Sequence, residues 1–424
     1  MKKLRVGLAG LGTVGKGVYD ILQKDAKLIS LRSQTKIEIV AVASRSKKDF
    51  LDPKIKFYPD VIALAFDPEI EVVVEVIGGC GIAKELLEEA LKNGKKVVTA
   101  NKALLAEHGL EIAKLVEKHN GYIGFEAAVA GANPIIKSFK EGLAANEFKE
   151  FYAILNGTCN FILTKMKDEK RDFAGVLKEA QKMGYAEADP TLDINGTDTA
   201  HKLTILAAIA SQNQPDFKQT YIEGIEKISF NDIKLAEEFG YKIKLLAIYK
   251  NLGDALQQTV YPALVKSSEK IAQVDGPFNA VLALASNADW NMTIGRGAGG
   301  LTTGSAIVSD LIDIACKRDK SFLFNAKAAD LDQKPIQAIS EHVGKYFLRM
   351  KIDKSKARKT DLVQAIFGDK IKIEQVNFID CNEEILCGFI TGEQKEKNII
   401  AILKNLDLEL IKSVGFLRIE ETNF

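Results

Sequence analysis

The feature that most limits how this chain can fold is a glycine motif placed directly after a predicted strand. The mostly apolar residues 4–9 predict a strand, the next six residues are G-L-G-T-V-G, and residues 13–22 have a helical period. In such a motif Gly10 allows a tight turn, Gly12 lets the backbone approach a pyrophosphate, and Gly15 lets the helix pack close to the strand. The succession predicts a dinucleotide site, and a glycine-rich structural turn is the alternative interpretation.

The residues around the motif indicate which dinucleotide the chain binds. Thr13 and Val14 begin the predicted helix, where unpaired N–H groups and the positive dipole end favour a phosphate. The second predicted strand ends in V-A-S-R-S-K-K, which lacks the carboxylate that commonly binds the ribose of NAD. Ser44 and Arg45 favour a 2′-phosphate there, so the sequence predicts NADP(H) over NAD(H), with a solvated basic loop as the alternative.

Predicted strands and helices alternate through the first part of the chain. After the glycine motif they comprise strands at 37–43, 72–77, 96–99 and 122–125, and helices at 82–92 and 103–118. Strands that alternate with helices of this length predict right-handed βαβ units around a parallel sheet. We therefore expect an α/β fold with an N-terminal Rossmann-type dinucleotide-binding domain over residues 1–130.

Two further regions follow this domain. Residues 131–294 predict an α+β domain with strands at 147–155, 241–249, 256–264 and 280–285, and the fold class suggests that one face of its sheet pairs with a second subunit. The composition turns polar at residues 321–335, where we expect a linker. Residues 343–424 then show the order strand, helix, strand, strand, helix, strand, which is typical of a ferredoxin-like module. Such a module has its own core and is expected to be separable at the linker.

Composition excludes several classes of function. Lys and Arg number 58 against 57 Asp and Glu, so no net field recruits nucleic acid or a membrane surface. The apolar runs are far shorter than the roughly 20 residues of a membrane span. The five cysteines form no C-x-x-C pair and the four histidines no H-E-x-x-H motif. These features indicate a cytoplasmic protein with reduced thiols rather than a disulfide framework or a zinc site.

The segment 184–202 carries the densest set of ionisable residues. A predicted helix begins there at Asn195 or Thr197, and it places Asp198 and Lys202 on one face, four residues apart. An ordinary surface salt bridge is the alternative interpretation. However, the helix continues through the nearly all-apolar residues 203–210, which predicts that its start is buried. Because a buried charge pair is costly, the pair indicates a functional site.

Together with Met183, Gly184 and Tyr185, this segment resembles the signature of the homoserine dehydrogenases. Four other segments are similar to motifs of the same family: V-I-G-G at 76–79, T-A-N-K at 99–102, N-G-T-C-N at 156–160 and G-R-G-A-G-G at 295–300. The C-terminal module is similar to an ACT regulatory domain. The resemblance covers nearly the whole chain, and the combination is more specific than any single motif.

The resemblance implies NAD(P)H-dependent reduction of L-aspartate 4-semialdehyde to L-homoserine, a step in threonine, methionine and isoleucine biosynthesis. It implies a homodimer or homotetramer, and a dinucleotide-binding domain that residues 295–320 complete. It also implies a role for individual residues: catalysis by Lys202, Asp198 and Lys102; substrate binding by Gly184, Glu187, Asp198 and Lys202; further cofactor contacts from Gly78, Lys102 and Gly299; and a structural sodium ion bound by Glu126, Val129, Gly131 and Asn133, mostly through backbone carbonyls.

Two segments depart from the family pattern. Residues 129–134 are V-A-G-A-N-P where the family has more glycine, and residues 353–358 lack the Pro-Gly turn of ACT domains, which predicts an altered effector pocket. Two other functions stay open. One is a semialdehyde dehydrogenase that acts through Cys159, although no histidine is near Cys159 in the sequence. The other is a non-catalytic regulator that senses a nucleotide and an amino acid.

Overall fold

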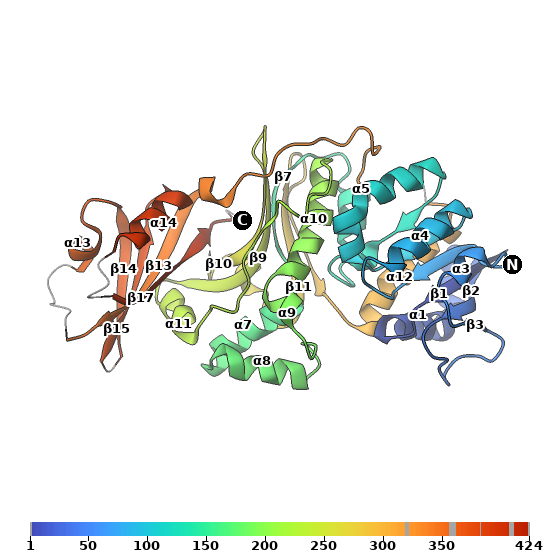
Figure 1. Ribbon diagram of the computed structural model, residues 1–424, viewed down its shortest axis with the longest axis horizontal. Helices are drawn as coiled ribbons and strands as arrows, with labels where there is room; N and C mark the ends of the chain where they lie inside the picture. Colours follow the sequence, from blue (N-terminus) through green and yellow to red (C-terminus); the bar gives the residue numbers. More distant parts are fainter. Residues whose placement is uncertain (1, 319–321, 356–361, 382, 407–410, 423–424) are drawn as a thin grey trace. The chain divides into compact units, whose positions relative to one another are not determined.

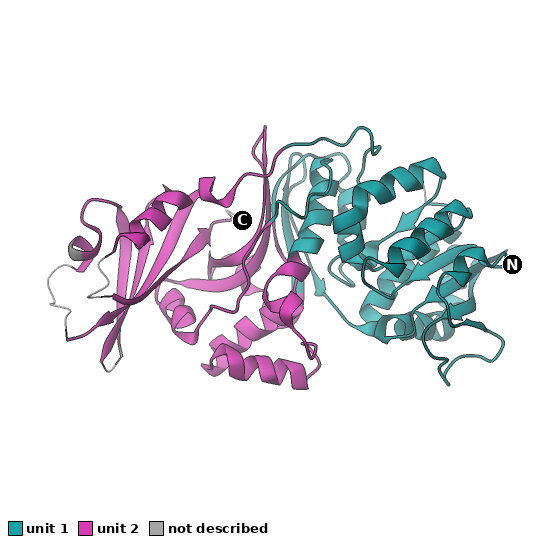
Figure 2. Ribbon diagram, viewed as in Figure 1, with its two compact units in different colours: residues 1–151, 200–220, 279–334 teal, residues 152–199, 221–278, 335–424 magenta. Residues whose placement is uncertain are grey.

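The structure is a computed structural model that describes residues 2–318, 322–355, 362–381, 383–406 and 411–422 (Figure 1). It divides into two compact units, which Figure 2 shows in different colours. The first unit comprises Met1–Phe151, Ala200–Thr220 and Asn279–Lys334, and the second comprises Tyr152–Thr199, Tyr221–Phe278 and Pro335–Phe424. Each unit is described by itself.

The first unit contains a six-stranded sheet with the order β3-β2-β1-β4-β5-β6. Every recorded strand pair in it is parallel. The four residues of β4 are all buried, as expected for a parallel strand covered on both faces. The order is that of a dinucleotide-binding fold, which confirms the predicted Rossmann-type sheet. Its strands are β1 (Lys2–Ala9), β2 (Thr35–Ala43), β3 (Lys56–Tyr58), β4 (Val72–Glu75), β5 (Lys96–Thr99) and β6 (Ile123–Gly124).

Helices surround this sheet. The predicted helix at 82–92 is confirmed as α4 (Ile82–Lys92), and the one at 103–118 as α5 (Lys102–Lys118). Helix α12 (Gly300–Ala315) packs against α1 (Thr13–Lys24), where a Cβ added at Gly17 would overlap the carbonyl oxygen of Gly300. Residues 300–315 thus complete the layer around the sheet. The other helical segments of this unit are α2 (Ala26–Ser33), α3 (Ala63–Phe66), α6 (Ile135–Lys137), η1 (Glu126–Ala128) and the π-helix η2 (Ser138–Gly142).

The second unit contains part of a mixed sheet. Strand β10 (Leu256–Lys266) pairs antiparallel with β9 (Tyr241–Asn251), and parallel with β8 (Tyr221–Ile222) and with β17 (Ile411–Glu420). Strand β12 (Asp289–Arg296) belongs to the first unit, and so does β11 (Phe278–Ala285) from Asn279 onward. Strand β7 (Phe148–Ile154) is divided between the units. The predicted α+β character of the middle region is confirmed, whereas the sequence did not predict β12.

Polar side chains cap the N-termini of two helices in the second unit. Asn156 caps α7 (Gly157–Glu169) by accepting from the Cys159 N–H, and Ser229 forms a capping box with Asp232 at α11 (Phe230–Glu238). The other helical segments are α8 (Phe173–Lys182), α9 (Thr191–Ile194), η3 (Ile271–Gln273), η4 (Ile339–Glu341), α13 (Leu362–Phe367) and α14 (Glu396–Lys404); α10 (Thr197–Ser211) is divided between the units.

The C-terminal segment has the predicted βαββαβ order. Strand β17 pairs with β13 (Val343–Asp353), which pairs with β15 (Glu384–Thr391), which pairs with β14 (Ile373–Cys381), all antiparallel; a two-residue β16 (Gln394–Lys395) is additional. Tyr346, Leu348, Phe367 and Phe389 belong to one buried apolar cluster, so the segment has the expected core of its own. Of the departing segment 353–358, residues 356–358 lie outside the described residues.

The expected linker at 321–335 is partly packed in its described residues. Leu323, Phe324 and Leu331 are buried, and Phe324 lies against Gly109 of α5. In the part of the chain that the structure describes, no helix has both the length and the apolar character required to cross a membrane.

Candidate active site

A cleft of about 800 Å³ in the first unit brings five of the predicted cofactor residues together. Gly10, Gly12, Ser44, Arg45 and Gly78 come from the loops that follow β1, β2 and β4, at the carboxyl ends of parallel strands. Ligands of open α/β sheets bind at this edge. The rest of the lining consists of Leu11, Ser46, Lys48, Pro59, Asp60, Val61, Val76, Ile77 and Ile82.

The glycines of the motif differ in their surroundings. Gly10 has a φ of +103°, and a Cβ there would lie 2.7 Å from the Val76 carbonyl oxygen. A Cβ at Gly15 would overlap the Gly10 carbonyl oxygen, whereas one at Gly12 would have no neighbour within 4 Å. Gly10 and Gly15 are therefore required by close packing. Gly12 instead leaves open space beside the backbone, as the approach of a pyrophosphate requires.

Two helix N-termini meet at this motif. Gly12 caps α1 and Gly299 caps α12, and neither helix has a side-chain capping bond. The helices begin close together, because a Cβ added at Gly300 would lie 2.7 Å from the Thr13 carbonyl oxygen. The N–H groups at the starts of both helices, including those of Thr13 and Val14, favour an anion. The structure thus places Gly299 beside the residues of the first glycine motif.

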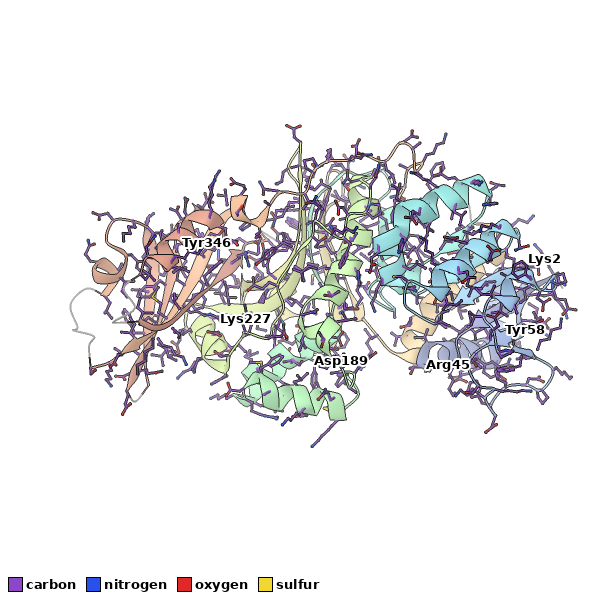
Figure 3. All side chains as sticks on the ribbon, in the orientation of Figure 1. Lys2, Arg45, Tyr58, Asp189, Lys227 and Tyr346 are labelled. Atoms are coloured by element: carbon purple, nitrogen blue, oxygen red, sulfur yellow. The ribbon has the colours of Figure 1, made fainter. Side chains whose placement is uncertain are left out.

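The loop after β2 supplies cations to the cleft wall. Arg45, which Figure 3 labels, is exposed, and Lys48 lines the same cleft. The Ser44 hydroxyl donates to the Ser46 carbonyl oxygen at 2.7 Å, which folds the loop back on itself. The wall also contains Asp60, whose carboxylate accepts from the Ile62 N–H at 3.0 Å. Ser46 and Lys48 were not among the predicted binding residues.

A buried carboxylate that the sequence analysis missed holds two predicted loops. Glu75, at the end of β4, accepts hydrogen bonds from the N–H groups of Ile77 (2.8 Å) and Gly78 (3.0 Å), and from the Thr99 hydroxyl (2.6 Å). Asn101 donates from its amide to the Gly79 carbonyl oxygen at 2.7 Å. Gly78 and the start of α5, where Lys102 is the first residue, are therefore fixed relative to each other. The sequence signal that could have indicated this role is an acidic residue directly after the apolar residues 72–74.

In the second unit, Asn156 connects two carboxylates. Its amide nitrogen donates to Asp193 at 2.8 Å and to Asp198 at 2.9 Å, while its amide oxygen accepts from the Cys159 N–H at 2.8 Å. Asp198 is only 6% exposed, so the predicted burial of the start of α10 is confirmed. A buried carboxylate such as Asp198 needs a donor, and Asn156 supplies one to it and a second to the half-buried Asp193. Asn156 belongs to the N-G-T-C-N motif but was not among the predicted site residues.

The remaining predicted catalytic and substrate residues divide between the units. Lys202 is half-buried on α10, four residues after Asp198, and belongs with Lys102 to the first unit. Gly184 and Glu187 lie between α8 and α9 in the second unit, with the Glu187 side chain exposed. Gly184 has a φ of +75°, a backbone conformation that favours glycine.

The Cys159 thiol lies in a closed environment. The residue has no exposed surface, and its Sγ donates to the Asp193 carbonyl oxygen at 3.2 Å. A thiol that attacks a substrate carbonyl has to be accessible and to form a thiolate readily. The surroundings of Cys159 therefore disfavour a covalent role.

The predicted sodium loop is almost entirely buried. Glu126 is 3% exposed, and its carboxylate accepts from the N–H groups of Ile136 and Lys137, both at 2.9 Å. Burial and the nearby Asp310 carboxylate raise the pKa of Glu126 to about 7. Ala130 and Gly131 both have left-handed backbones, with φ of 57° and 58°. A buried carboxylate in a sharply turned loop fits an oxygen-ligated cation, which would offset the cost of burying that charge.

The side chain of Asn133 adds to this fit. It is buried, and within the described part of the chain its Nδ2 has no hydrogen-bond partner. The Asn133 backbone carbonyl accepts from the Ile135 N–H at 2.7 Å. Because amide oxygen and nitrogen can exchange places by a flip, the side chain can present its oxygen to the loop.

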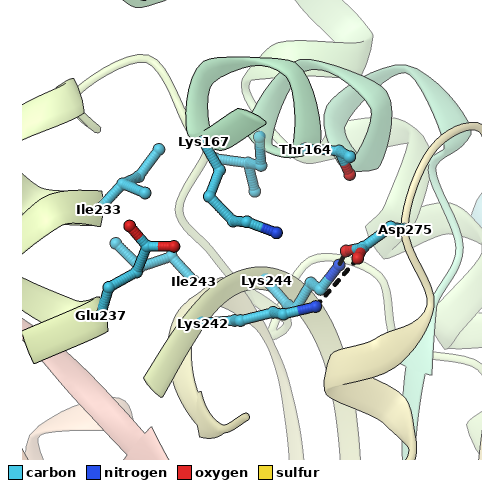
Figure 4. Close-up of a pocket in the computed structure, with 9 residues that line it drawn as sticks. Thr164, Lys167, Ile233, Glu237, Lys242, Ile243, Lys244 and Asp275 are labelled. Atoms are coloured by element: carbon cyan, nitrogen blue, oxygen red, sulfur yellow. Dashed lines mark hydrogen bonds and ion pairs between the residues drawn. The ribbon is translucent and has the colours of Figure 1, made fainter. Parts of the chain in front are cut away.

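Several charged side chains line a small pocket in the second unit, which Figure 4 shows, and they form ion pairs with one another. Lys242 and Lys244 both bind the Asp275 carboxylate, at 2.9 and 2.7 Å. Lys244 also donates to the Asn160 side-chain oxygen at 3.0 Å, and burial lowers the pKa of Lys244 to about 8. Asn160 is the last residue of the N-G-T-C-N motif, so this cluster anchors α7, whose cap Asn156 holds Asp198.

The comparisons with known proteins agree with this geometry. Residues 10–126 match a family model described as homoserine dehydrogenase, NAD binding domain, and residues 134–312 match a model described as homoserine dehydrogenase. A homoserine dehydrogenase of Neisseria gonorrhoeae is 41% identical over 99% of both chains. The crystal structure of a homoserine dehydrogenase from Thiobacillus denitrificans has a TM-score of 0.92 and 38% identity over 99% of both chains.

A hyperthermophilic archaeal homoserine dehydrogenase, solved in complex with NADPH, is a more distant relative. It has a TM-score of 0.63 and 25% identity, and the match covers 74% of this chain and 98% of that chain. About a quarter of the present chain therefore has no counterpart in the archaeal enzyme.

Proposed function

The chain belongs to the homoserine dehydrogenase family, and from this premise we propose that it uses NADP(H) in preference to NAD(H). The family's reaction interconverts L-aspartate 4-semialdehyde and L-homoserine, and the NAD-binding domain makes the chain an oxidoreductase. The observation that carries the cofactor proposal is the cleft that joins the glycine motif to Arg45 and Lys48. Two cations suit a 2′-phosphate, and the archaeal relative was solved with NADPH.

We propose that Lys202 is the general acid of the reduction. When bound, the nicotinamide supplies the hydride. The Lys202 ammonium stabilises the negative charge that develops on the carbonyl oxygen and donates the proton that this oxygen requires. Asp198, one helical turn earlier, positions Lys202, and Asn156 in turn holds Asp198 at 2.9 Å. Lys102 begins α5 beside Gly78, and we assign it a position between cofactor and substrate.

The substrate also carries an ammonium and a carboxylate. The Glu187 carboxylate is exposed and matches the ammonium in charge. Backbone N–H groups near Gly184 suit the carboxylate. We assign Gly184, Glu187, Asp198 and Lys202 to substrate binding.

The finer architecture is also part of the proposal. Residues 1–130 and 295–320 bind the dinucleotide, residues 131–294 bind substrate and form a homodimer or homotetramer, and residues 343–424 act as an ACT-like regulatory domain. Glu126, Val129, Gly131 and Asn133 bind a structural sodium ion. The burial and left-handed turn of that loop support the last assignment.

Two rival functions have less support. A semialdehyde dehydrogenase that acts through Cys159 requires an accessible thiol, whereas this one is fully buried. A non-catalytic sensor has no need of the bonds from Asn156 to the buried Asp198. A phosphate-dependent oxidation of the semialdehyde would support the first rival, and binding without turnover would support the second.

A steady-state assay tests the proposal. Homoserine is supplied with NADP⁺ and, separately, with NAD⁺, and the reduced nicotinamide is followed by its absorbance, with and without added phosphate. We expect phosphate-independent turnover with a higher kcat/KM for NADP⁺. Equal or higher efficiency with NAD⁺ would contradict the cofactor preference, and absent turnover with both would contradict the activity.

A further inference from the structure

Three potential metal ligands meet in the first unit outside the assigned site residues. One ligand atom from each of Cys80, Glu107 and His108 lies within 4.8 Å of the other two. Cys80 lies in the loop before α4, whereas Glu107 and His108 are neighbours on α5. The sequence spacing gives no sign of this cluster, because the fold brings a loop and a helix together.

The chemistry of the three ligands selects a class of metal. A thiolate sulfur with an imidazole nitrogen suits Zn²⁺ or Co²⁺, and a carboxylate oxygen is an accepted third ligand for both. Mg²⁺ and Ca²⁺ prefer sites made only of oxygen. We propose that Cys80, Glu107 and His108 bind one transition-metal dication of the Zn²⁺ class, with a fourth position open to water.

Neighbouring residues support this geometry. The Glu111 carboxylate lies 3.5 Å from Nδ1 of His108, and the His201 Nε2 lies 3.3 Å from the Glu107 carboxylate. Contacts of this type orient metal ligands in known sites. Lys84 opposes the cation, because its Nζ lies 3.3 Å from the same His108 nitrogen while binding Glu111 at 2.5 Å. A bound dication therefore repels the nearby Lys84 ammonium, which limits the affinity.

The protonation state of Cys80 adds a pH dependence. Burial, Glu107 and Glu75 raise the pKa of the Cys80 thiol, and Lys84 lowers it to a lesser degree. Because a metal binds the thiolate rather than the thiol, Cys80 has to release its proton when a metal binds. Affinity for the metal increases as the pH rises.

Metal bound at this cluster is expected to affect turnover, because the cluster lies next to residues assigned to the active site. Cys80 lies between Gly79, whose carbonyl accepts from Asn101, and Gly81, which caps α4. A bound metal would tie this loop to α5. It would also pull on Glu107 and through it on His201, the residue before Lys202. We expect occupancy to inhibit the enzyme; this part rests on the proposed function, whereas metal binding does not.

Cobalt titration of the tag-free full chain tests binding directly, with a phosphine reductant in place of competing thiols. Wild type is expected to develop near-ultraviolet thiolate-to-cobalt absorbance and visible d–d bands that Zn²⁺ displaces. Cys80→Ser and His108→Gln are expected to weaken binding roughly 100-fold or more, since even outer contacts are worth 10–100-fold. The matched control is Cys316→Ser, because that half-buried thiol lies outside the cluster, 4.0 Å from the Arg32 carbonyl oxygen.

The binding proposal is overturned if Cys80→Ser binds cobalt as wild type does, or if Cys316→Ser abolishes the signal. A second measurement addresses turnover: Zn²⁺ is expected to inhibit wild type, a chelator to restore it, and Cys80→Ser to be insensitive. Normal turnover with the site loaded would overturn the inhibition. Absent turnover in the metal-free wild type would instead contradict the proposed function, and the optical result would still stand.

Discussion

Arg45 is an exposed side chain on the wall of the cleft, and the proposed function assigns it to the 2′-phosphate of NADP(H). Arg45→Ala is therefore expected to raise the KM for NADP⁺ by roughly 10–100-fold, the value of one or two charge-assisted hydrogen bonds. The KM for NAD⁺ should not change, because NAD⁺ has no phosphate to lose. Initial rates with both cofactors measure the difference.

The control for this substitution is Lys47→Ala, which removes an exposed cation of the same loop that does not line the cleft. Its effect on NADP⁺ should be small. Equal losses for the two variants would indicate general attraction by the basic loop rather than a contact made by Arg45.

In the proposed mechanism, Lys202 is the residue on which the chemistry depends most. Lys202→Met keeps the length of the side chain but removes the ammonium, and kcat is expected to fall by roughly 10²–10⁴-fold, as for loss of a general acid. The KM for NADP⁺ should change little. Stopped-flow single turnovers with homoserine show whether the loss falls on the chemical step. Turnover near wild type, with an unchanged melting temperature, would remove Lys202 from the mechanism.

Residues with local roles could be predicted from the sequence, and residues that act through the fold could not. Gly10 was predictable because its φ follows from a turn between adjacent elements. Glu75 acts on Thr99, and Asn156 acts on Asp198, across 24 and 42 positions. No local pattern contains these pairs, so tertiary contacts alone reveal them. Cys80 and His108 are a third example.

The elements that were predicted well are those with one strongly apolar face. Helix α4 buries Ala83, Leu86, Leu87, Ala90 and Leu91, and its bounds match the prediction. Strand β12 was missed because it has no fully buried residue, with partly buried and exposed positions mixed along it. Helix α2 was missed for a related reason, since it buries only Ile29 and Ser33. Hydrophobic periodicity in the sequence reflects which side chains are buried. Elements with few buried side chains therefore give no clear periodic pattern.

The contact between α1 and α12 depends on glycine. A Cβ at Gly17 would overlap the Gly300 carbonyl, which is backbone and cannot move aside cheaply. Gly17→Ala is therefore expected to destabilise the chain by about 1–3 kcal/mol or more, the usual cost of overpacking. The urea midpoint and slope of wild type and variant measure this change.

Gly142→Ala is the matched control, because a Cβ there meets nothing within 4 Å. Its stability should stay within about 0.5 kcal/mol of wild type or rise slightly. If Gly17→Ala were as stable as this control, the close approach of the two helices would be wrong.

At the scale of the whole molecule, the C-terminal segment is more firmly attached than its sequence indicates. Its predicted core is confirmed, but β17 pairs with β10, and Arg418 of β17 is 1% exposed. Arg418 binds Glu396 at 2.6 and 2.7 Å and Glu223 at 2.8 Å. The sequence could not predict this, because one arginine in a strand has the same pattern whether it is solvated or buried.

Arg418→Met tests that attachment. The variant leaves the buried Glu396 carboxylate without its partner, so the free energy of unfolding is expected to fall by about 3–5 kcal/mol. The control is Arg318→Met, which removes an arginine with a 62% exposed side chain paired to Asp313. Its loss should stay below about 1 kcal/mol. Similar losses for both variants would show that Arg418 contributes no more than a surface charge.

The proposed regulatory role of the C-terminal segment is tested with threonine. If residues 343–424 are an ACT-like module, threonine is the effector that the family resemblance implies, through unequal binding to two states of the enzyme. Residues 353–358 lack the Pro-Gly turn, so we expect threonine to inhibit the full chain weakly or not at all. Initial rates over a threonine titration measure this, and strong inhibition would show that the effector pocket does not need the turn.

A chain that ends at Pro335 gives the complementary test of the module. It removes β17, leaves an edge of β10 uncovered and takes away the Arg418 partner of Glu223. Because an uncovered strand edge promotes aggregation, we expect the shortened chain to lose stability and to associate, contrary to the separability that the sequence indicates. Light scattering and thermal melting compare it with the full chain. A soluble, active and equally stable shortened chain would mean that the β10–β17 pairing contributes little to the fold, and threonine inhibition surviving in it would place the effector site outside the module.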